Sequence, residues 1–185
     1  MLNQFNEEYK NVMLAAENRV RQFWHREILP EDVLIQIAAL KSGNAYDLFT
    51  SFGLNDAIFL DVLSRPPFAP TTSRDGVYVG ISERVKWLIV MSMKIAASFH
   101  KSQAGVEDFL LALFRTESEN WFYQVLDFVG ISPKDFETQV IEVNTLIAWA
   151  WGGNGNGGIF APIEEIMKML EETFSGKKQN TNNNG

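Results

Sequence analysis

The sequence predicts an all-α protein made of two pseudo-twofold-related four-helix repeats, followed by a glycine-rich hinge and a C-terminal amphipathic helix. Three observations carry this prediction. Apolar residues recur at steps of three and four along most of the 185 residues. The segment PEDVLIQIAAL at 30–40 is nearly repeated as VEDFLLALF at 106–114. A stretch containing three prolines, 64–81, separates the two copies and cannot be helical.

The first repeat spans about residues 1–63 and begins with a long helix over 5–24. Its apolar face consists of Phe5, Tyr9, Val12, Ala16, Val20 and Phe23. Asn6 or Asn3 is expected to cap this helix, because an amide oxygen accepts from the first free N–H groups.

Three shorter helices complete the first repeat. In the helix over 30–40, Pro30 suits the first helical position, and the acids Glu31 and Asp32 suit its positive end. Helices over 44–52 and 55–63 follow, separated by Gly53 in the left-handed conformation that ends many helices.

The second repeat spans about residues 82–147, after the joint at 64–81. Ser82 is expected to cap a long helix that reaches Phe99. Further helices are predicted near 106–115, 118–129 and 133–147, with Gly130 at the second stop.

Matching residues of the two repeats lie at a nearly constant separation. Pairs 76 or 77 residues apart are Glu31 and Glu107, Asp32 and Asp108, Leu34 and Leu110, Tyr46 and Tyr123, and Gly53 and Gly130. A change of the separation from 76 to 77 residues, caused by one extra residue in a loop, is typical of duplicated helical units. Such units bury their apolar faces against each other.

Composition excludes several classes of function. The net charge of −7 argues against a nucleic-acid partner, and the basic group Arg19, Arg21, His25 and Arg26 is interpreted as a helix end. With no cysteine and two histidines, one in each half, we expect no metal site and no cofactor in this chain. The N-terminus is unlike a signal peptide, and the segment WLIVMSMKIAASF is too short to span a bilayer, so a cytoplasmic protein without membrane contact is expected.

The residue pattern resembles the double Clp N-terminal domain of ATP-dependent Clp unfoldases and disaggregases of the ClpA, ClpB and ClpC type. The resemblance covers about residues 1–147. It rests on Phe5, His25, Glu31 and Leu34 in the first repeat and on Ser82, Val85, Lys86, Leu88, Ala96, Glu107 and Leu110 in the second. Asp32 and Asp108 stand where the family often has histidine.

The resemblance implies a non-catalytic domain that recruits unfolded or tagged protein substrates, or an adaptor protein, to a Clp ATPase body. ATP and magnesium are expected only in that ATPase part, since this chain has no G-x-x-x-x-G-K-[ST] motif. Two alternatives remain open. One is a stand-alone accessory protein that docks on a Clp protease or ATPase, and the other is a small enzyme using Glu31 and Glu107, although no nucleophile–base spacing is present.

Relatives that recognise phosphorylated arginine bind its guanidinium with an acidic residue of each repeat and its phosphate at the start of the preceding long helix. The matching positions here are Asn6 with Glu31 and Ser82 with Glu107. A carboxylate suits a guanidinium, and a helix N-terminus suits an anion. The alternative is that both glutamates only stabilise helix dipoles, and the aspartate beside each one would repel a phosphate.

A second candidate site is a hydrophobic groove between the repeats, lined by Phe68 and Tyr78 of the joint. Alternatively, these aromatics attach the joint to the core. Residues 148–158 are expected to form a flexible hinge, because no strand precedes their glycines and no lysine follows at phosphate-loop spacing. An amphipathic helix over 159–175 and a disordered tail over 176–185 complete the chain.

Overall fold

The computed structural model describes residues 2–69, 76–116 and 121–151. The amphipathic helix expected over 159–175, the tail, and the hinge from residue 152 onward lie outside these residues. Within the described ranges, no helix is long and apolar enough to cross a membrane.

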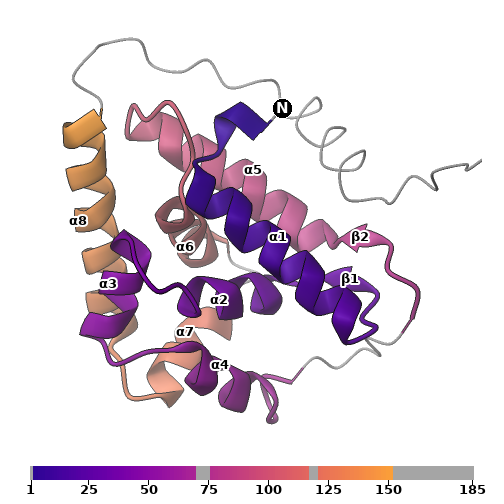
Figure 1. Ribbon diagram of the computed structural model, residues 1–185. Coiled ribbons are helices and arrows are strands. Elements are labelled where there is room, and N and C mark those ends of the chain that lie inside the picture. Colours follow the sequence, from indigo (N-terminus) through magenta and orange to yellow (C-terminus); the bar gives the residue numbers. More distant parts are fainter. Residues whose placement is uncertain (1, 70–75, 117–120, 152–185) are drawn as a thin grey trace, which may run out of the picture.

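The predicted all-α fold class is confirmed, with four helices from each repeat in the described part of the chain (Figure 1). The first repeat forms α1 (Glu7–Gln22), α2 (Pro30–Ala38), α3 (Asn44–Ser51) and α4 (Asp56–Leu63). The second forms α5 (Glu83–Ser98), α6 (Val106–Arg115), α7 (Trp121–Phe128) and α8 (Pro133–Trp151). A short 3-10 turn, η1 (Leu2–Gln4), precedes α1.

The last helix is longer than predicted. We expected the hinge to begin at residue 148, but α8 continues to Trp151, so residues 148–151 are helical. Alanine and tryptophan are compatible with a helix, and the first glycine of the run stands at position 152.

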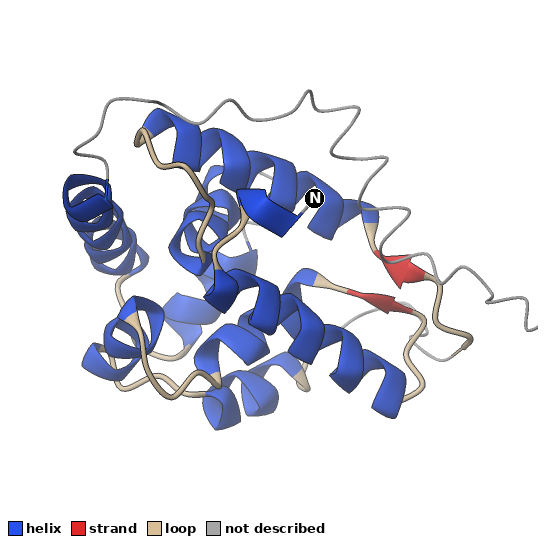
Figure 2. Ribbon diagram, turned by 45° about the horizontal axis from the view of Figure 1, so that its top comes forward, coloured by secondary structure: helices blue, strands red, loops and turns tan. Residues whose placement is uncertain are grey.

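The second helix of each repeat lies at the centre of the molecule. Helix α1 packs on α2 as α5 packs on α6 (Figure 1), and apart from one short pair of strands the regular elements of the described residues are helices (Figure 2). Helix α6 also contacts α1 and α3 of the other repeat, and α3 contacts α8. The buried apolar residues of both repeats therefore form one continuous core.

Two short parallel backbone pairings connect the repeats, and the sequence did not predict them. Strand β1 (Glu27–Ile28) pairs with β2 (Gly80–Ile81), and Phe5 forms an isolated parallel bridge with Ala104. The two pairings are equivalent under the 76-residue offset. In each, the residues before the long helix of one repeat pair with the residues before the second helix of the other repeat. Pairings this short have no alternation that could reveal them in the sequence.

Side-chain caps fix where the helices begin. The Asn6 Oδ1 atom accepts from the Tyr9 N–H at 2.8 Å, and the Ser82 Oγ atom accepts from the Val85 N–H at 3.3 Å. Both predicted caps of the long helices are therefore confirmed.

The aspartates that depart from the family pattern also cap helices. Asp32 Oδ2 accepts from the Leu29 N–H at 2.9 Å, and Asp108 Oδ2 accepts from the Gly105 N–H at 2.7 Å. A carboxylate three residues into a helix that bonds back to the cap residue is half of a capping box.

Left-handed residues end several helices. Gly53 has a φ of 69° and Gly130 a φ of 81°, as their positions predicted. The long helices end differently, because Trp24 (φ 57°) and His100 (φ 55°) are left-handed although neither is glycine. The next residue then closes each helix end, with the His25 N–H donating to Val20 O and the Lys101 N–H donating to Ala96 O, both at 2.9 Å.

Replacing Trp24 by glycine is expected to stabilise the fold. A left-handed L-residue costs about 1–2 kcal/mol, and the Trp24 side chain is 78% exposed, so its removal sacrifices little packing. We expect Trp24→Gly to raise the free energy of unfolding by up to about 1 kcal/mol in urea denaturation, since glycine also gains freedom in the unfolded chain. Phe23→Gly is the control, because Phe23 has a φ of −93° and relieves no strain. A clear loss of stability in Trp24→Gly would contradict this explanation.

Candidate functional site

The structure assembles each candidate site from both repeats, so the predicted pairing of positions is wrong. We paired Asn6 with Glu31 and Ser82 with Glu107, each within one repeat. Instead, Asn6 and Glu107 line one pocket, and Glu31 forms an ion pair with Arg84, two residues after Ser82. The backbone pairings are the cause, since the Asn6 N–H donates to Ala104 O and the Ser82 N–H to Ile28 O, both at 3.0 Å.

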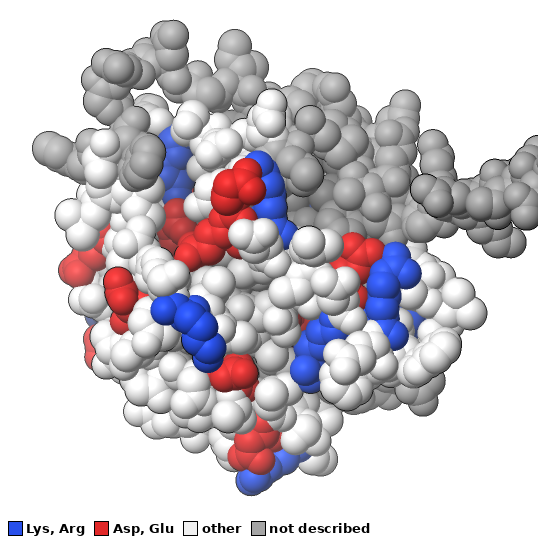
Figure 3. Space-filling view, in the orientation of Figure 1, with Lys and Arg blue, Asp and Glu red and all other residues white. Residues whose placement is uncertain are grey.

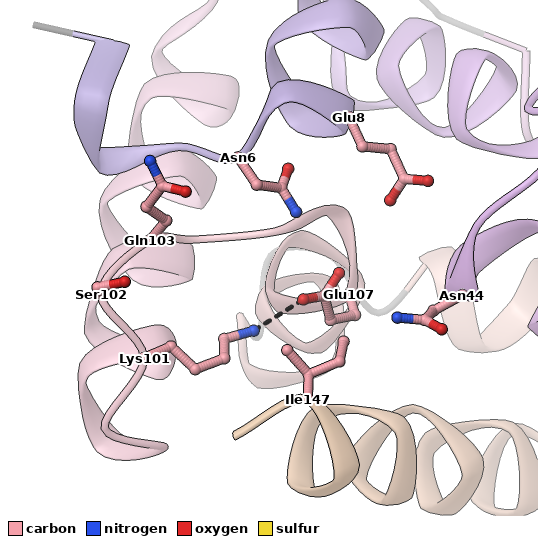
Figure 4. Close-up of a pocket in the computed structure, with 8 residues that line it drawn as sticks. All are labelled: Asn6, Glu8, Asn44, Lys101, Ser102, Gln103, Glu107 and Ile147. Carbon is pink, nitrogen blue, oxygen red and sulfur yellow. Dashed lines mark hydrogen bonds and ion pairs between the residues drawn. The ribbon is translucent and has the colours of Figure 1, made fainter. Parts of the chain in front are cut away.

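We call the two sites the first seam, around Asn6 and Glu107, and the second seam, around Ser82 and Glu31. The first seam holds a pocket of about 250 Å³ (Figure 4). Its lining residues come from the start of α1, the start of α3, the α5–α6 loop, α6 and the end of α8: Asn6, Glu8, Asn44, Lys101, Ser102, Gln103, Glu107 and Ile147. One side is therefore polar and carries two carboxylates, and Ile147 adds an apolar wall.

A buried ammonium group forms one side of the first seam. The Lys101 side chain is 5% exposed, and its Nζ atom lies 2.8 Å from Glu107 Oε1, 2.6 Å from Asp108 Oδ2 and 2.7 Å from Asn144 Oδ1. An ammonium group has three N–H donors, so these acceptors satisfy all of them. The network joins the α5–α6 loop to α6 and α8.

Two glycines make room for the carboxylates of the first seam. A Cβ atom on Gly105 would collide with the Glu107 carboxylate, and a Cβ on Gly43 would collide with Glu8 Oε1. Gly43 also has a φ of 93°, which disfavours any other residue. The carboxylate of Glu8 therefore occupies the space that a side chain at position 43 would need, and the carboxylate of Glu107 occupies the space that a side chain at position 105 would need.

Two carboxyl groups of the first seam, those of Glu8 and Asp108, have raised pKa values. Burial, with a smaller contribution from the charge of Glu107, raises the pKa of Glu8 from 4.5 to about 7. Burial also raises the pKa of Asp108 to about 7, although the Lys101 ammonium opposes the shift. Of these three carboxylates, those of Glu107 and Asp108 contact the Lys101 ammonium.

The second seam has the equivalent backbone pairing, but its side chains carry different charges. Under the 76-residue offset, Glu8 corresponds to Arg84 and Lys101 corresponds to His25. Arg84 Nη1 lies 3.3 Å from Glu31 Oε1, and its side chain is 38% exposed. A cation thus stands beside the start of α5, where the first seam has the carboxylate of Glu8.

Four residues of these seams were not predicted from the sequence: Glu8, Lys101, Asn144 and Arg84. The 76-residue offset could have revealed three of them, because it sets Glu8 against Arg84 and Lys101 against His25. Asn144 gave no signal, since its counterpart would lie after α4, where the first repeat has no helix.

The two aromatic residues of the joint contact different helices. Phe68 makes an edge-to-face contact with Phe128 of α7 at 5.5 Å between ring centroids, and the Arg21 guanidinium of α1 lies 3.9 Å from the centre of the Tyr78 ring. These contacts attach the joint to the folded body at two points. A substrate groove lined by both aromatics remains a prediction.

Acidic and basic side chains are interspersed on the face shown in Figure 3, where Lys and Arg do not gather into one basic surface. Some charged side chains form local pairs three or four residues apart in the sequence, such as Lys10 with Glu7 and Arg65 with Asp61. Exposed pairs of this kind contribute little to stability.

Removing the Asn144 amide is expected to destabilise the protein, because one proton of the buried Lys101 ammonium would lose its acceptor. We expect Asn144→Ala to lower the free energy of unfolding by about 1–3 kcal/mol in urea denaturation. Gln139→Ala, at an exposed position of the same helix, is the control and should change it by less than about 0.5 kcal/mol. A similarly small change in Asn144→Ala would mean that the network is not needed for stability.

Glu8 should make stability depend on pH. Its pKa is higher in the folded chain than its ordinary value, so the folded chain retains a proton that the unfolded chain releases between about pH 4.5 and 7. Stability due to Glu8 is therefore present below this window and lost as the pH rises through 7. We expect Glu8→Gln to match the wild type near about pH 4 and to be more stable near about pH 8 in urea denaturation. Glu7→Gln is the control, and a pH-independent difference for Glu8→Gln would contradict the shift.

The comparisons with known proteins agree with the fold and the repeat. The profile of the family described as "Clp repeat (R) N-terminal domain" matches residues 4–128. Relatives include the chloroplastic chaperone proteins ClpC2 of Oryza sativa subsp. japonica and of Arabidopsis thaliana. Each is 26% identical to this chain, and the match covers 93% of the length of this chain. The chain spans 19% of each of these relatives.

A solved structure shares the fold. A chain from structural investigations of a malarial protein secretion system superposes with a TM-score of 0.56 at 18% identity, covering 78% of this chain and 99% of the other. Its identity is low, so this likeness supports the fold alone. The family profile covers more than half of the sequence, and the chain belongs to the Clp repeat N-terminal domain family.

Proposed function

We propose that this chain recruits protein substrates or an adaptor protein to a Clp ATPase and has no catalytic activity of its own. The family match over residues 4–128 carries the proposal. The relatives are named as chaperones or as ATP-binding subunits of a Clp protease, and this chain corresponds to about a fifth of their length.

The two seams are the proposed binding sites, with Asn6 and Glu107 at the first and Ser82 and Glu31 at the second. Each combines a carboxylate with the N-terminus of a long helix, a pair of features that suits a ligand carrying both a cation and an anion. Both carboxylates already contact a cation of the chain, Lys101 or Arg84. A ligand must therefore share or displace that partner.

The seams differ in their suitability for a phosphorylated arginine. At the second seam Arg84 lies beside the start of α5, where its guanidinium would attract a phosphate. At the first seam the carboxylate of Glu8 stands in the equivalent place and would repel it. We therefore assign any phosphoarginine binding to Ser82, Arg84 and Glu31.

Weak contacts are sufficient for such a role when several copies act together. The resemblance implies a ring of several ATPase subunits, and copies of a tethered domain would raise the local concentration of binding sites around its pore. A substrate held by more than one copy is bound more tightly than any single site allows.

Calorimetric titration of the whole chain tests the proposal, with a permanently unfolded model polypeptide and with free phosphoarginine as separate ligands. We expect the polypeptide to bind. Any phosphoarginine binding should weaken about tenfold in Arg84→Gln, which removes a charge-assisted contact. Lys94→Gln, an exposed position on the same helix, is the matched control. An absence of heat with both ligands would contradict the direct recruitment of substrates and leave adaptor docking to be tested.

A further inference from the structure

Exposed apolar side chains gather where α1 ends and the joint returns toward β2. We call this surface the end patch, and it consists of Phe23, Trp24, Val77 and Val79. The Gly76 N–H donates to Trp24 O at 3.0 Å. Three residues later the Val79 N–H donates to Arg26 O at 2.7 Å, so the two chain segments lie side by side. Contiguous exposed apolar residues of this kind mark interaction surfaces.

Trp24 is the member of the end patch that the fold explains least. Its backbone is left-handed, with a φ of 57°, and His100 at the equivalent position of the second repeat is left-handed too. The bend therefore belongs to both repeats, and glycine would adopt it at lower cost. Trp24 is nevertheless a large apolar residue that is 78% exposed. Such a side chain at a strained position indicates contact with something outside the described residues.

Cations flank the end patch. The Arg19 guanidinium lies 4.9 Å from the centre of the Phe23 ring, and Arg26 is exposed beside the patch. Arg21 is paired with Glu17 at 2.7 Å. Neither Arg19 nor Arg26 forms an ion pair with any residue that the structure describes. The end patch therefore suits an apolar ligand that carries negative charge.

Residues 159–175 of this chain have the complementary character. The sequence predicts an amphipathic helix there, with an apolar stripe made of Ile163, Ile166, Met167, Leu170 and Phe174. The charged residues of the segment are four glutamates and one lysine, so its net charge is −3: Glu164, Glu165, Lys168, Glu171 and Glu172. A short helix gains most of its stability by packing its apolar face on another surface.

The segment is long enough to reach the end patch. Ile147 of α8 and Asn6 at the start of α1 line the same pocket (Figure 4), so the end of α8 lies near the start of α1. The end patch lies at the other end of α1, which has 16 residues and is therefore about 24 Å long. The seven residues 152–158 span up to about 25 Å when extended, and the predicted helix adds its own length.

We propose that residues 159–175 dock as an amphipathic helix on the end patch of the same chain. Their apolar stripe lies on Trp24 and Val77, and their glutamates lie beside Arg19 and Arg26. A partner that uses the end patch must then displace this segment. The inference goes beyond the proposed function and does not depend on it.

Paramagnetic broadening of the NMR signals of the whole chain tests this docking. The sequence has no cysteine, so Ser175→Cys provides a single thiol for a nitroxide, and position 175 lies off the apolar stripe. We expect the amide signals of Val77 and Val79 and the indole signal of Trp24 to be broadened most strongly.

Two substitutions in the segment show whether the apolar stripe makes the contact. Leu170→Gln keeps the charge and should lower the docking equilibrium at least about tenfold, the effect of losing one buried leucine. Lys168→Gln, on the opposite face of the predicted helix, is the matched control and should retain the broadening. Both positions lie outside the helices of the two repeats, so folding does not confound the comparison.

One substitution on the body tests the charges. Arg26→Glu should weaken the broadening at Val77 and Val79, whereas Lys94→Glu, at an exposed position of α5, should leave it unchanged.

Broadening that is spread evenly over the surface, or that is the same in Leu170→Gln, would overturn the proposal. Nitroxide-bearing chains are also mixed with isotope-enriched chains that lack the nitroxide. Broadening at the end patch in this mixture would identify a second copy as the occupant and overturn docking within one chain. The proposed function is tested separately, because this experiment contains no substrate and no adaptor.

Discussion

The geometry of both seams depends on two reciprocal backbone pairings between the repeats. Phe5 pairs with Ala104, and Ile28 pairs with Ile81. Each pairing holds the start of a long helix in one repeat beside the start of the second helix in the other. The cap residues Asn6 and Ser82 therefore face glutamates of the opposite repeat, and neither seam exists within a single repeat.

This shared backbone carries two different arrangements of charge. The first seam buries a lysine from the α5–α6 loop and presents a glutamate on the long helix, whereas the second presents an arginine on the long helix. The two repeats have side chains at equivalent positions, and the residues at those positions differ in charge between the seams. The two seams thus differ in charge although their backbone pairings are equivalent.

The sequence was sufficient to predict the helices and their caps because those depend on local patterns. Apolar periodicity marked each helix, Gly53 and Gly130 marked two stops, and Asn6 and Ser82 marked two starts. The pairing of Asn6 with Glu107 depends on contacts between residues about a hundred positions apart, and a two-residue strand leaves no local pattern. The 76-residue offset revealed the duplication, but it could not show that the repeats exchange partners. The length of α8 was also missed, because composition placed the hinge four residues too early.

The position of the caps bears on whether Glu31 and Glu107 only stabilise helix dipoles. In each repeat the neighbouring aspartate accepts the N–H of the cap residue, so Asp32 and Asp108 perform the capping. The dipole favours any acid in the first turn and requires no particular orientation of its carboxylate. Yet Glu31 reaches an arginine, and Glu107 reaches a lysine from outside its helix. The dipole explains why an acid is tolerated at these positions, whereas contact with a cation explains where each carboxylate points.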